Sequence, residues 1–155
     1  MMRLGKRFFK KIHDYLFEGL YPFTGQIRTK TISKECFVFA NGDFLLQILI
    51  DIEKMPDNTF AEIVDKYIEM NIAHPFLEGN GRSTRIWLDL LLKKRIHKCI
   101  DWSKIEKDKY LFAMKESQFN PKQIYKLLND TLTTQIDNRE IFMKGIDYSY
   151  YYKEE

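Results

Sequence analysis

The sequence predicts an all-α fold, in which one helical domain carries a single small β-hairpin. Seven glycines and four prolines among 155 residues leave few helix breakers, so long helices are expected. Apolar residues recur at helical spacing along most of the chain, whereas the stretch 26–40 is rich in β-branched and aromatic residues. The length suits one compact domain over residues 1–155, and no linker or repeat indicates a boundary.

The elements of the N-terminal third follow from residue spacing and from helix breakers. A helix is expected over 7–20, where Gly19 and a nearby proline end the apolar periodicity. The stretch 26–40 predicts the β-hairpin. Helical spacing returns over 44–53 and stops before Pro56.

Two central helices carry the clearest signals. Thr59 and Glu62 predict a capping box at the start of the first. This helix should end at His74, because a residue that precedes proline is disfavoured in the α conformation. The second, expected from about 81 to 94, is apolar nearly all round, which is typical of the buried centre of a bundle.

The C-terminal third is expected to be helical as well. Ser103 with Glu106 suggests another capping box, and Asn120 with Pro121 suggests a helix N-cap followed by a proline at the first helical position. The spacing over 137–152 predicts a last helix.

Composition disfavours several classes of protein. No apolar run approaches the about 20 residues of a membrane-spanning helix, so no membrane association is expected. Cys36 and Cys99 match no metal-binding or disulfide pattern, and a cytoplasmic location is the default. A net charge of +3 makes nucleic acid an unfavoured partner, and the basic stretch 93–98 suits a helix C-terminus in water better than a DNA-binding surface. The oligomeric state stays open, a homo-oligomer included.

Residues 74–85 concentrate the chemistry-bearing side chains between the two central helices; they read HPFLEGNGRSTR. Gly79 and Gly81 flank Asn80, a residue that tolerates left-handed geometry. Such a loop can direct successive backbone N–H groups inward as an anion nest. It leads into a helix N-terminus, which also favours an anion.

The charged residues of this segment point to a metal-bound polyphosphate. Arg82 and Arg85 share one face of the helix start, and two cations there are unfavourable unless phosphates lie between them. Glu78 would repel those phosphates unless a cation such as Mg²⁺ joined them. His74 is the residue type suited to accept a proton near neutral pH.

Taken singly, each of these features has an ordinary explanation. A Gly-Asn-Gly run is usually a plain turn, an arginine pair on a helix is usually solvated, and a histidine at a helix end is usually a surface or capping residue. Their joint occurrence within twelve residues favours the phosphate site.

The segment 74–85 also resembles the signature of the Fic domain family, His-x-Phe-x-Asp/Glu-Gly-Asn-Gly-Arg-x-x-Arg, with every defined position filled. Residues 21–28 resemble the family's upstream segment, with Thr24 where alanine is more usual, and 32–40 resembles its β-hairpin flap. The resemblance covers essentially the whole chain. It implies AMPylation, the transfer of AMP from ATP to a Ser, Thr or Tyr hydroxyl of a target protein, and also of the enzyme itself.

The resemblance implies a role for each motif residue. His74 would deprotonate the target hydroxyl, and Glu78 would hold Mg²⁺. Asn80 would join His74 as a catalytic residue, and with the backbone of Gly79 and Gly81 it would cradle the α- and β-phosphate oxygens. The residues implied to bind the ATP phosphates are Gly79, Asn80, Gly81, Arg82 and Arg85, with Arg82 on the β-phosphate and Arg85 on the γ-phosphate.

The resemblance extends to both edges of the site. Ile32, Ser33 and Lys34 of the flap would dock a segment of the target protein by strand-like pairing. A helix over about 138–155 resembles the inhibitory helix of one class of the family, with Ser149 in place. Lys153 stands where that class has glutamate, and Glu154 is one residue late, about 100° around a helix, so weakened inhibition is expected.

Two alternatives stay open. Nothing in the phosphate loop selects the nucleoside, so a Fic-like transfer of another phosphate-containing group, such as UMP, phosphate or phosphocholine, fits the same residues. A non-catalytic regulatory module that binds nucleotide or protein also fits the loop. His74 disfavours this module, because pure binding needs no base at that position.

Overall fold

The computed structural model describes residues 6–34 and 37–141, with side chains described for 9–32 and 39–141. Its elements lie in the order α1 (Lys6–Phe17), β1 (Ser33–Lys34), β2 (Phe37–Val38), the 3₁₀ turn η1 (Gly42–Phe44), α2 (Leu45–Lys54), α3 (Phe60–Ala73), α4 (Asn80–Ile96), β3 (Cys99–Ile100), the 3₁₀ turn η2 (Trp102–Lys104), α5 (Lys107–Glu116), α6 (Lys122–Asp130) and β4 (Leu132–Thr133).

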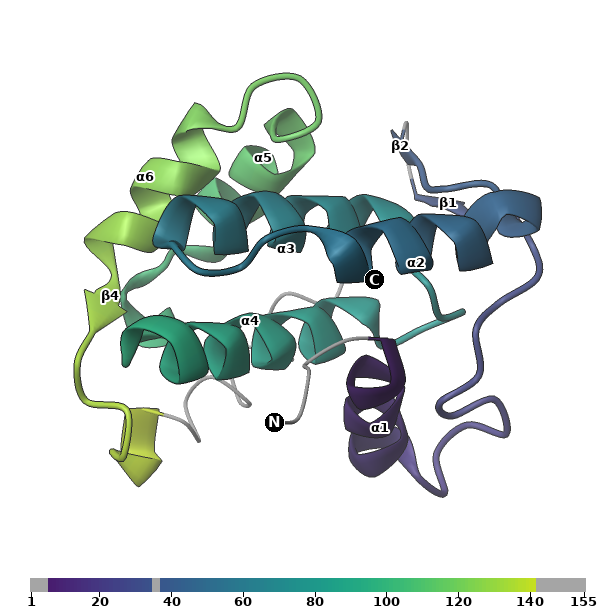
Figure 1. Cartoon of the computed structure of the whole chain (residues 1–155), viewed down its shortest axis with the longest axis horizontal. Helices are drawn as coiled ribbons and strands as arrows, with labels where there is room; N and C mark the ends of the chain where they lie inside the picture. Colours follow the sequence, from purple (N-terminus) through teal and green to yellow (C-terminus); the bar gives the residue numbers. More distant parts are fainter. Residues whose placement is uncertain (1–5, 35–36, 142–155) are drawn as a thin grey trace.

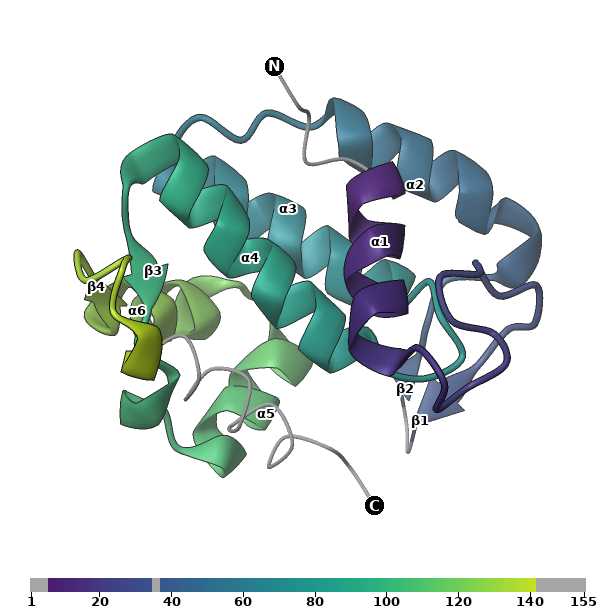
Figure 2. The same cartoon turned by 90° about the horizontal axis from the view of Figure 1, so that it is seen from below.

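The core forms around α3 and α4, which run antiparallel beside each other (Figure 1). α2 covers one side of α3, and α1 crosses the N-terminal half of α4 (Figure 2). The largest side chains are fully buried at these contacts, among them Phe9, Tyr67, Phe76, Trp87 and Leu88. This burial confirms the prediction that α4 is the buried centre of the bundle.

The predicted helix ends are confirmed at some positions and wrong at others. The capping box of α3 is present, because Thr59 Oγ1 accepts from Glu62 N (3.2 Å) and Glu62 Oε1 accepts from Thr59 N (3.1 Å). The capping box expected at Ser103 is wrong. Ser103 lies in η2, where Asp101 Oδ1 accepts from its N–H (3.2 Å), and α5 begins later without a side-chain cap.

Two other helix boundaries differ slightly from the prediction. α1 ends at Phe17 rather than at residue 20, because Gly19 adopts a left-handed φ of 82°. α6 begins at Lys122, one residue later than expected. The predicted cap still acts there, since Asn120 Oδ1 accepts from Lys122 N (3.1 Å).

The described residues form two small antiparallel sheets rather than one hairpin. β1 and β2 pair Ser33 with Val38, so the hairpin is confirmed, although it is shorter than the stretch 26–40. β3 and β4 form a second sheet that pairs Cys99 with Thr133, and it was not predicted. Strands of two residues are too short to show an alternating pattern in the sequence.

The C-terminal helix expected over about 138–155 is described only at its start, where residues 139–141 are helical. Ser149, Lys153 and Glu154 lie outside the described residues. Within the described part, no helix has both the length and the apolar character needed to cross a membrane.

Candidate active site

His74 occupies the C-terminal end of α3 in a left-handed conformation, with φ 47° and ψ 62°. Its backbone N–H still bonds to Met70 O (3.0 Å), as in the helix. The left-handed φ and ψ then turn the chain away from the helix axis at this residue. The side chain is buried, and its ring stacks on that of Phe39 with centroids 3.6 Å apart. α3 therefore delivers the imidazole to the same end of the molecule at which α4 begins (Figures 1 and 2).

The loop between α3 and α4 is closed by Asn80, the first residue of α4. Asn80 Oδ1 accepts from Phe76 N (2.8 Å), and Asn80 Nδ2 donates to Phe76 O (2.7 Å). Phe76 is fully buried between the rings of Phe9 and His13, which fixes the loop on α1. The side chain of Asn80 thus has a structural task, which the motif alone did not predict.

Gly79 is required by geometry at the start of α4. Its φ of 82° lies in the left-handed region, and a Cβ there would overlap the Phe17 ring, only 2.7 Å from Phe17 Cζ. Gly79 has no side chain with which to cap this helix end, and the first turn contains no acidic residue. A helix N-terminus of this composition suits a bound anion.

The two arginines of the motif come from the first turns of α4. The Arg82 guanidinium carbon lies 5.3 Å from the centre of the Phe17 ring. Arg85 is buried, and its guanidinium carbon lies 5.8 Å from the ring centre of Tyr110 on α5. A Cβ on Gly81 would approach Arg85 Nη1 to 3.0 Å, so the Arg85 side chain folds back toward the helix N-terminus.

A buried polar layer lies beneath Arg85. The hydroxyl groups of Tyr67 and Tyr110 bond to each other, and burial raises the pKa of Tyr67. Asp89, one turn after Arg85, accepts from Ile100 N (2.9 Å) and Trp102 Nε1 (2.8 Å). Burial raises the pKa of Asp89 to about 7, while these hydrogen bonds and the Arg85 charge act in the opposite direction.

Glu78 presents its carboxylate to solvent from the loop. One residue near the N-terminus bonds to this carboxylate, and another bonds to the Glu78 backbone carbonyl. Tyr21 OH donates to Glu78 Oε2 (3.2 Å), and His13 Nε2 lies 2.7 Å from the Glu78 carbonyl oxygen. The described residues contain no group of three potential metal-ligating side chains. A single exposed carboxylate fits Mg²⁺ that takes its other ligands from phosphates and water.

His13 holds the motif loop from the inside. Its Nδ1 accepts from Gly25 N (2.9 Å), so its Nε2 carries the proton and donates to the Glu78 carbonyl. The ring is fully buried, and burial lowers the pKa of His13 below the ordinary 6.5. The predicted site residues did not include His13, although it lies on the apolar face of α1 between Phe9 and Phe17, each four residues away.

The flap residues lie on the His74 side of the site. Ile32 O accepts from Phe39 N (3.1 Å) next to the β1–β2 pair, and Phe39 carries the ring that covers His74. Ser33 and Lys34 form β1, and their side chains lie outside the described ones. The flap backbone is therefore positioned beside the candidate base.

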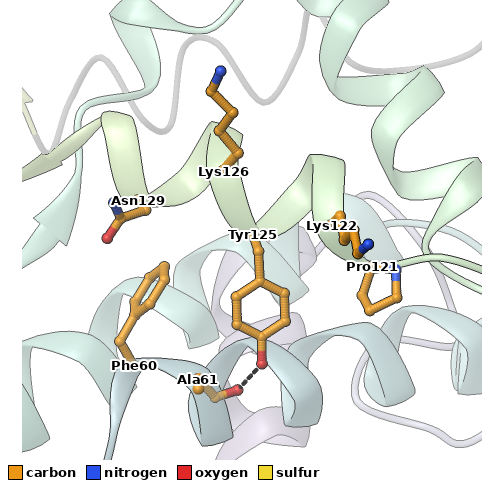
Figure 3. A pocket seen from close by; sticks show the side chains of 7 residues that line it. All are labelled: Phe60, Ala61, Pro121, Lys122, Tyr125, Lys126 and Asn129. Carbon is orange, nitrogen blue, oxygen red and sulfur yellow. Dashed lines mark hydrogen bonds between the residues drawn. The ribbon is translucent and has the colours of Figure 1, made fainter.

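A separate groove of about 690 Å³ lies between α3 and α6 and includes no residue of 74–85. Phe60 and Tyr125 both line it, and their rings pack edge to face with centres 6.1 Å apart (Figure 3). Tyr125 OH bonds to Ala61 O (2.5 Å), so its hydroxyl joins the two helices. The groove is therefore distinct from the site that the motif residues form.

Comparison with known proteins establishes the family. The model of the Fic/DOC family matches residues 3–92, more than half of the chain. The chain belongs to the Fic/DOC family. This confirms the resemblance read from residues 74–85, and the described helices with their small hairpin agree with the expected Fic fold.

Three curated relatives of this Fic/DOC chain are protein adenylyltransferases by name. It is 30% identical over 144 residues to protein adenylyltransferase VbhT of Bartonella schoenbuchensis, covering 85% of this chain and 30% of that protein. It is 26% identical to the probable protein adenylyltransferase y4lH of Sinorhizobium fredii, over 68% of this chain and 61% of the relative. The probable protein adenylyltransferase Fic of Escherichia coli is also 26% identical, over 64% of this chain and 54% of the relative. The chain thus spans less than two thirds of each relative.

Solved Fic structures share the fold of this Fic/DOC chain. BepC of Bartonella tribocorum, solved with bound AMPPNP, superposes with a TM-score of 0.72 at 22% identity, over 86% of this chain and 76% of that one. The N-terminal Fic domain of a putative cell filamentation protein of Bartonella quintana, solved with bound ADP, gives a TM-score of 0.73 at 21% identity, over 91% and 77%.

Proposed function

We propose that this Fic/DOC chain transfers AMP from Mg-ATP to a hydroxyl side chain of a target protein. The observation that carries the proposal is the N-terminal end of α4. It combines a helix N-terminus with no acidic residue in its first turn, a left-handed glycine and two arginines, and it lies next to a histidine at the end of α3. A triphosphate is the ligand class that would use all of these groups. The relatives' names and the nucleotides bound in the solved neighbours support the same ligand.

The residues divide the work of binding. Backbone N–H groups of Gly79, Asn80 and Gly81 would hold the α- and β-phosphates, with Arg82 on the β-phosphate and Arg85 on the γ-phosphate. Glu78 would hold Mg²⁺, which when bound neutralises part of the phosphate charge. Asn80 would contribute through its backbone, since its side-chain amide bonds to Phe76.

The transfer step would be a displacement at the α-phosphorus of ATP. His74 would take the proton of the target hydroxyl as its oxygen forms a bond to the α-phosphorus. The bond from the α-phosphorus to the bridging oxygen breaks, and pyrophosphate leaves. The β1–β2 flap beside Phe39 would hold the target segment by strand-like pairing, so that its hydroxyl lies next to His74. Positioning and charge stabilisation are what phosphoryl chemistry mainly needs.

The test uses ATP labelled at the α-phosphate, with γ-labelled ATP in parallel, and a cell lysate as the source of targets. Only the α label should enter protein. His74→Asn should reduce labelling by about a hundredfold or more, the range expected for removal of a general base. ATP binding, measured by calorimetry, should persist in this variant.

The chain offers a matched control for this substitution. His97 ends α4 as His74 ends α3, also in the left-handed conformation, with φ 54°. Asparagine tolerates that conformation, so His97→Asn removes an imidazole at similar backbone cost and should label at the wild-type rate. Equal labelling by the two variants would remove His74 as the base, and γ label in protein would indicate phosphate transfer instead.

A further inference from the structure

Arg28 is a buried arginine whose side chain bonds to backbone carbonyl groups. It is 4% exposed. Its Nε donates to His74 O (2.7 Å), and its Nη2 donates to Ala73 O (2.9 Å) and to Ala40 O (2.7 Å). Its Nη1 donates to Lys30 O (2.5 Å). None of the ion pairs among the described residues includes Arg28.

Two of these contacts, to the Ala73 and His74 carbonyls, explain why a charged side chain can be buried here. Ala73 ends α3 and His74 follows it, so their carbonyls belong to the group that lacks partners within the helix. That end of a helix also carries partial negative charge, which favours a cation. The backbone N–H of Arg28 adds a bond to Pro75 O (2.8 Å), so one residue bonds to three consecutive carbonyls.

These bonds fix the backbone on both sides of His74. A left-handed conformation costs about 1–2 kcal/mol for a residue other than glycine, and it persists only where neighbouring groups enforce it. Arg28 holds the His74 and Pro75 carbonyls on the C-terminal side of the His74 Cα atom and the Ala73 carbonyl on its N-terminal side. Arg28 therefore constrains the backbone from which the imidazole leaves.

The same guanidinium also holds the base of the flap. Lys30 precedes β1 and Ala40 follows β2, so Arg28 joins the two chain segments that lead into and out of the hairpin. Ala40 follows Phe39, whose ring stacks on His74. A second link, from Ala40 N to Ile72 O (3.1 Å), ties this strand end to α3.

We propose that Arg28 is a positioning residue that holds the His74 imidazole and the base of the flap in one geometry. The hydroxyl of a target segment docked on the flap would then lie next to the His74 imidazole without further movement of either element. The inference rests on the proposed function for its catalytic consequence. Its structural half, control of His74 by Arg28, can be measured without any transfer reaction.

The test compares Arg28→Lys with the wild-type chain. Lysine keeps the positive charge but presents its donors from one point, so it cannot span carbonyls on both the flap and α3. We expect transfer at saturating Mg-ATP to fall about tenfold to a hundredfold, the cost of a misplaced catalytic group. The affinity for Mg-ATP should change less than about twofold, because the Arg28 hydrogen bonds described above go to the flap base and the end of α3 and not to a predicted phosphate-binding residue.

Lys66 provides a matched control on the same helix. It is also a buried cation that donates to backbone carbonyls, with Nζ 3.1 Å from Met55 O, and it pairs with Asp57 at 3.1 Å. It lies eight residues before His74, about 12 Å along the helix. Lys66→Met should lower the melting temperature while the transfer rate at a permissive temperature stays at the wild-type value.

A spectroscopic readout separates positioning from general stability. The chain has three histidines, so the imidazole signals of ¹⁵N-histidine-labelled protein can be assigned with one variant each. In Arg28→Lys the His74 signals should shift or broaden, while those of His13 and His97 stay in place. Unchanged His74 signals, or equal shifts of all three histidines in both Arg28→Lys and Lys66→Met, would overturn the inference. Absence of label transfer by the wild-type chain would overturn the proposed function instead, and the spectra would still decide the role of Arg28.

Discussion

The two ends of α4 follow opposite rules. The C-terminal end places Lys93, Lys94 and Arg95 in the last turn, where cations complement the helix dipole. Arg95 also pairs with Asp57 at 2.9 Å. The N-terminal end has neither an acidic residue nor a side-chain cap, and it places Arg82 at the positive end of the dipole.

The difference teaches how the candidate site is stabilised. The cations of the C-terminal end suit the helix dipole by a local rule, to which the ion pair with Asp57 adds, whereas the N-terminal end breaks that rule and is held by residues from elsewhere in the chain. α1 supplies Phe17 beneath Gly79 and His13 beneath the Glu78 carbonyl. Where phosphates would bind, the helix end lacks the residues that stabilise a helix N-terminus locally. Packing against α1 compensates for this loss, as is common at functional sites.

Gly79→Ala should have the largest effect on stability, because it attacks the N-terminal end directly. Alanine at φ 82° costs about 1–2 kcal/mol, and overpacking against Phe17 adds about 1–3 kcal/mol. Gly19→Ala is the matched control, since Gly19 has the same φ of 82° and an added Cβ there would have no atom within 4 Å. Urea denaturation should show a loss clearly larger for Gly79→Ala. Equal losses would mean that the contact between Gly79 and Phe17 does not constrain the loop.

Much of this site could be predicted from local sequence, because residues 74–85 contain its charged and glycine residues in one run. The helices followed from spacing, and the capping box at Thr59 from a pattern spanning four residues. What the sequence could not predict depends on distant partners. His13 meets Glu78 across 65 positions, and Arg28 meets His74 across 46. Nothing local to either residue indicates its partner.

The unpredicted second sheet has the same cause. β3 and β4 are two residues each and pair only because α5 and α6 fold back between them. The prediction of a capping box at Ser103 was wrong because a competing acceptor lies two residues earlier. Asp101 Oδ1 accepts the hydrogen bond from the Ser103 N–H. A local motif can thus be present in the sequence and be overridden by a neighbouring side chain.

Asp89→Asn should give an intermediate effect and tests the middle of α4, between the two contrasting ends. The pKa of Asp89 is about 7 in the folded chain against 3.8 for the ordinary group. Between these values the folded state binds a proton that the unfolded state lacks, so this group lowers stability as pH rises from about 4 to 7. The slope is at most about 1.4 kcal/mol per pH unit.

The measurement is the free energy of unfolding of wild-type and Asp89→Asn proteins at several values between about pH 5 and pH 7.5, within and just above the window that the raised pKa defines. The wild-type protein should lose stability relative to the variant across this range, because asparagine does not titrate. The variant sacrifices one acceptor for Ile100 N or Trp102 Nε1, which offsets the two curves by a constant amount. Parallel curves would show that Asp89 stays ionised through the range.

Arg95→Gln should have the smallest effect and sharpens the description of the C-terminal end. Lys93→Gln is its control, because both residues lie in the last turn of α4 and lose the same charge there. The Lys93 pair with Asp137 is exposed at 3.6 Å, whereas Arg95 meets a largely buried Asp57 at 2.9 Å. Exposed pairs contribute about 0–1 kcal/mol to the free energy of unfolding. The loss of stability should therefore be close to zero for Lys93→Gln and near the upper end of that range for Arg95→Gln.

Because the last turn lies at the opposite end of the helix from the glycine loop, Mg-ATP affinity should be unchanged in both variants. A weakened affinity in Arg95→Gln alone would mean that the two ends of α4 are coupled rather than independent.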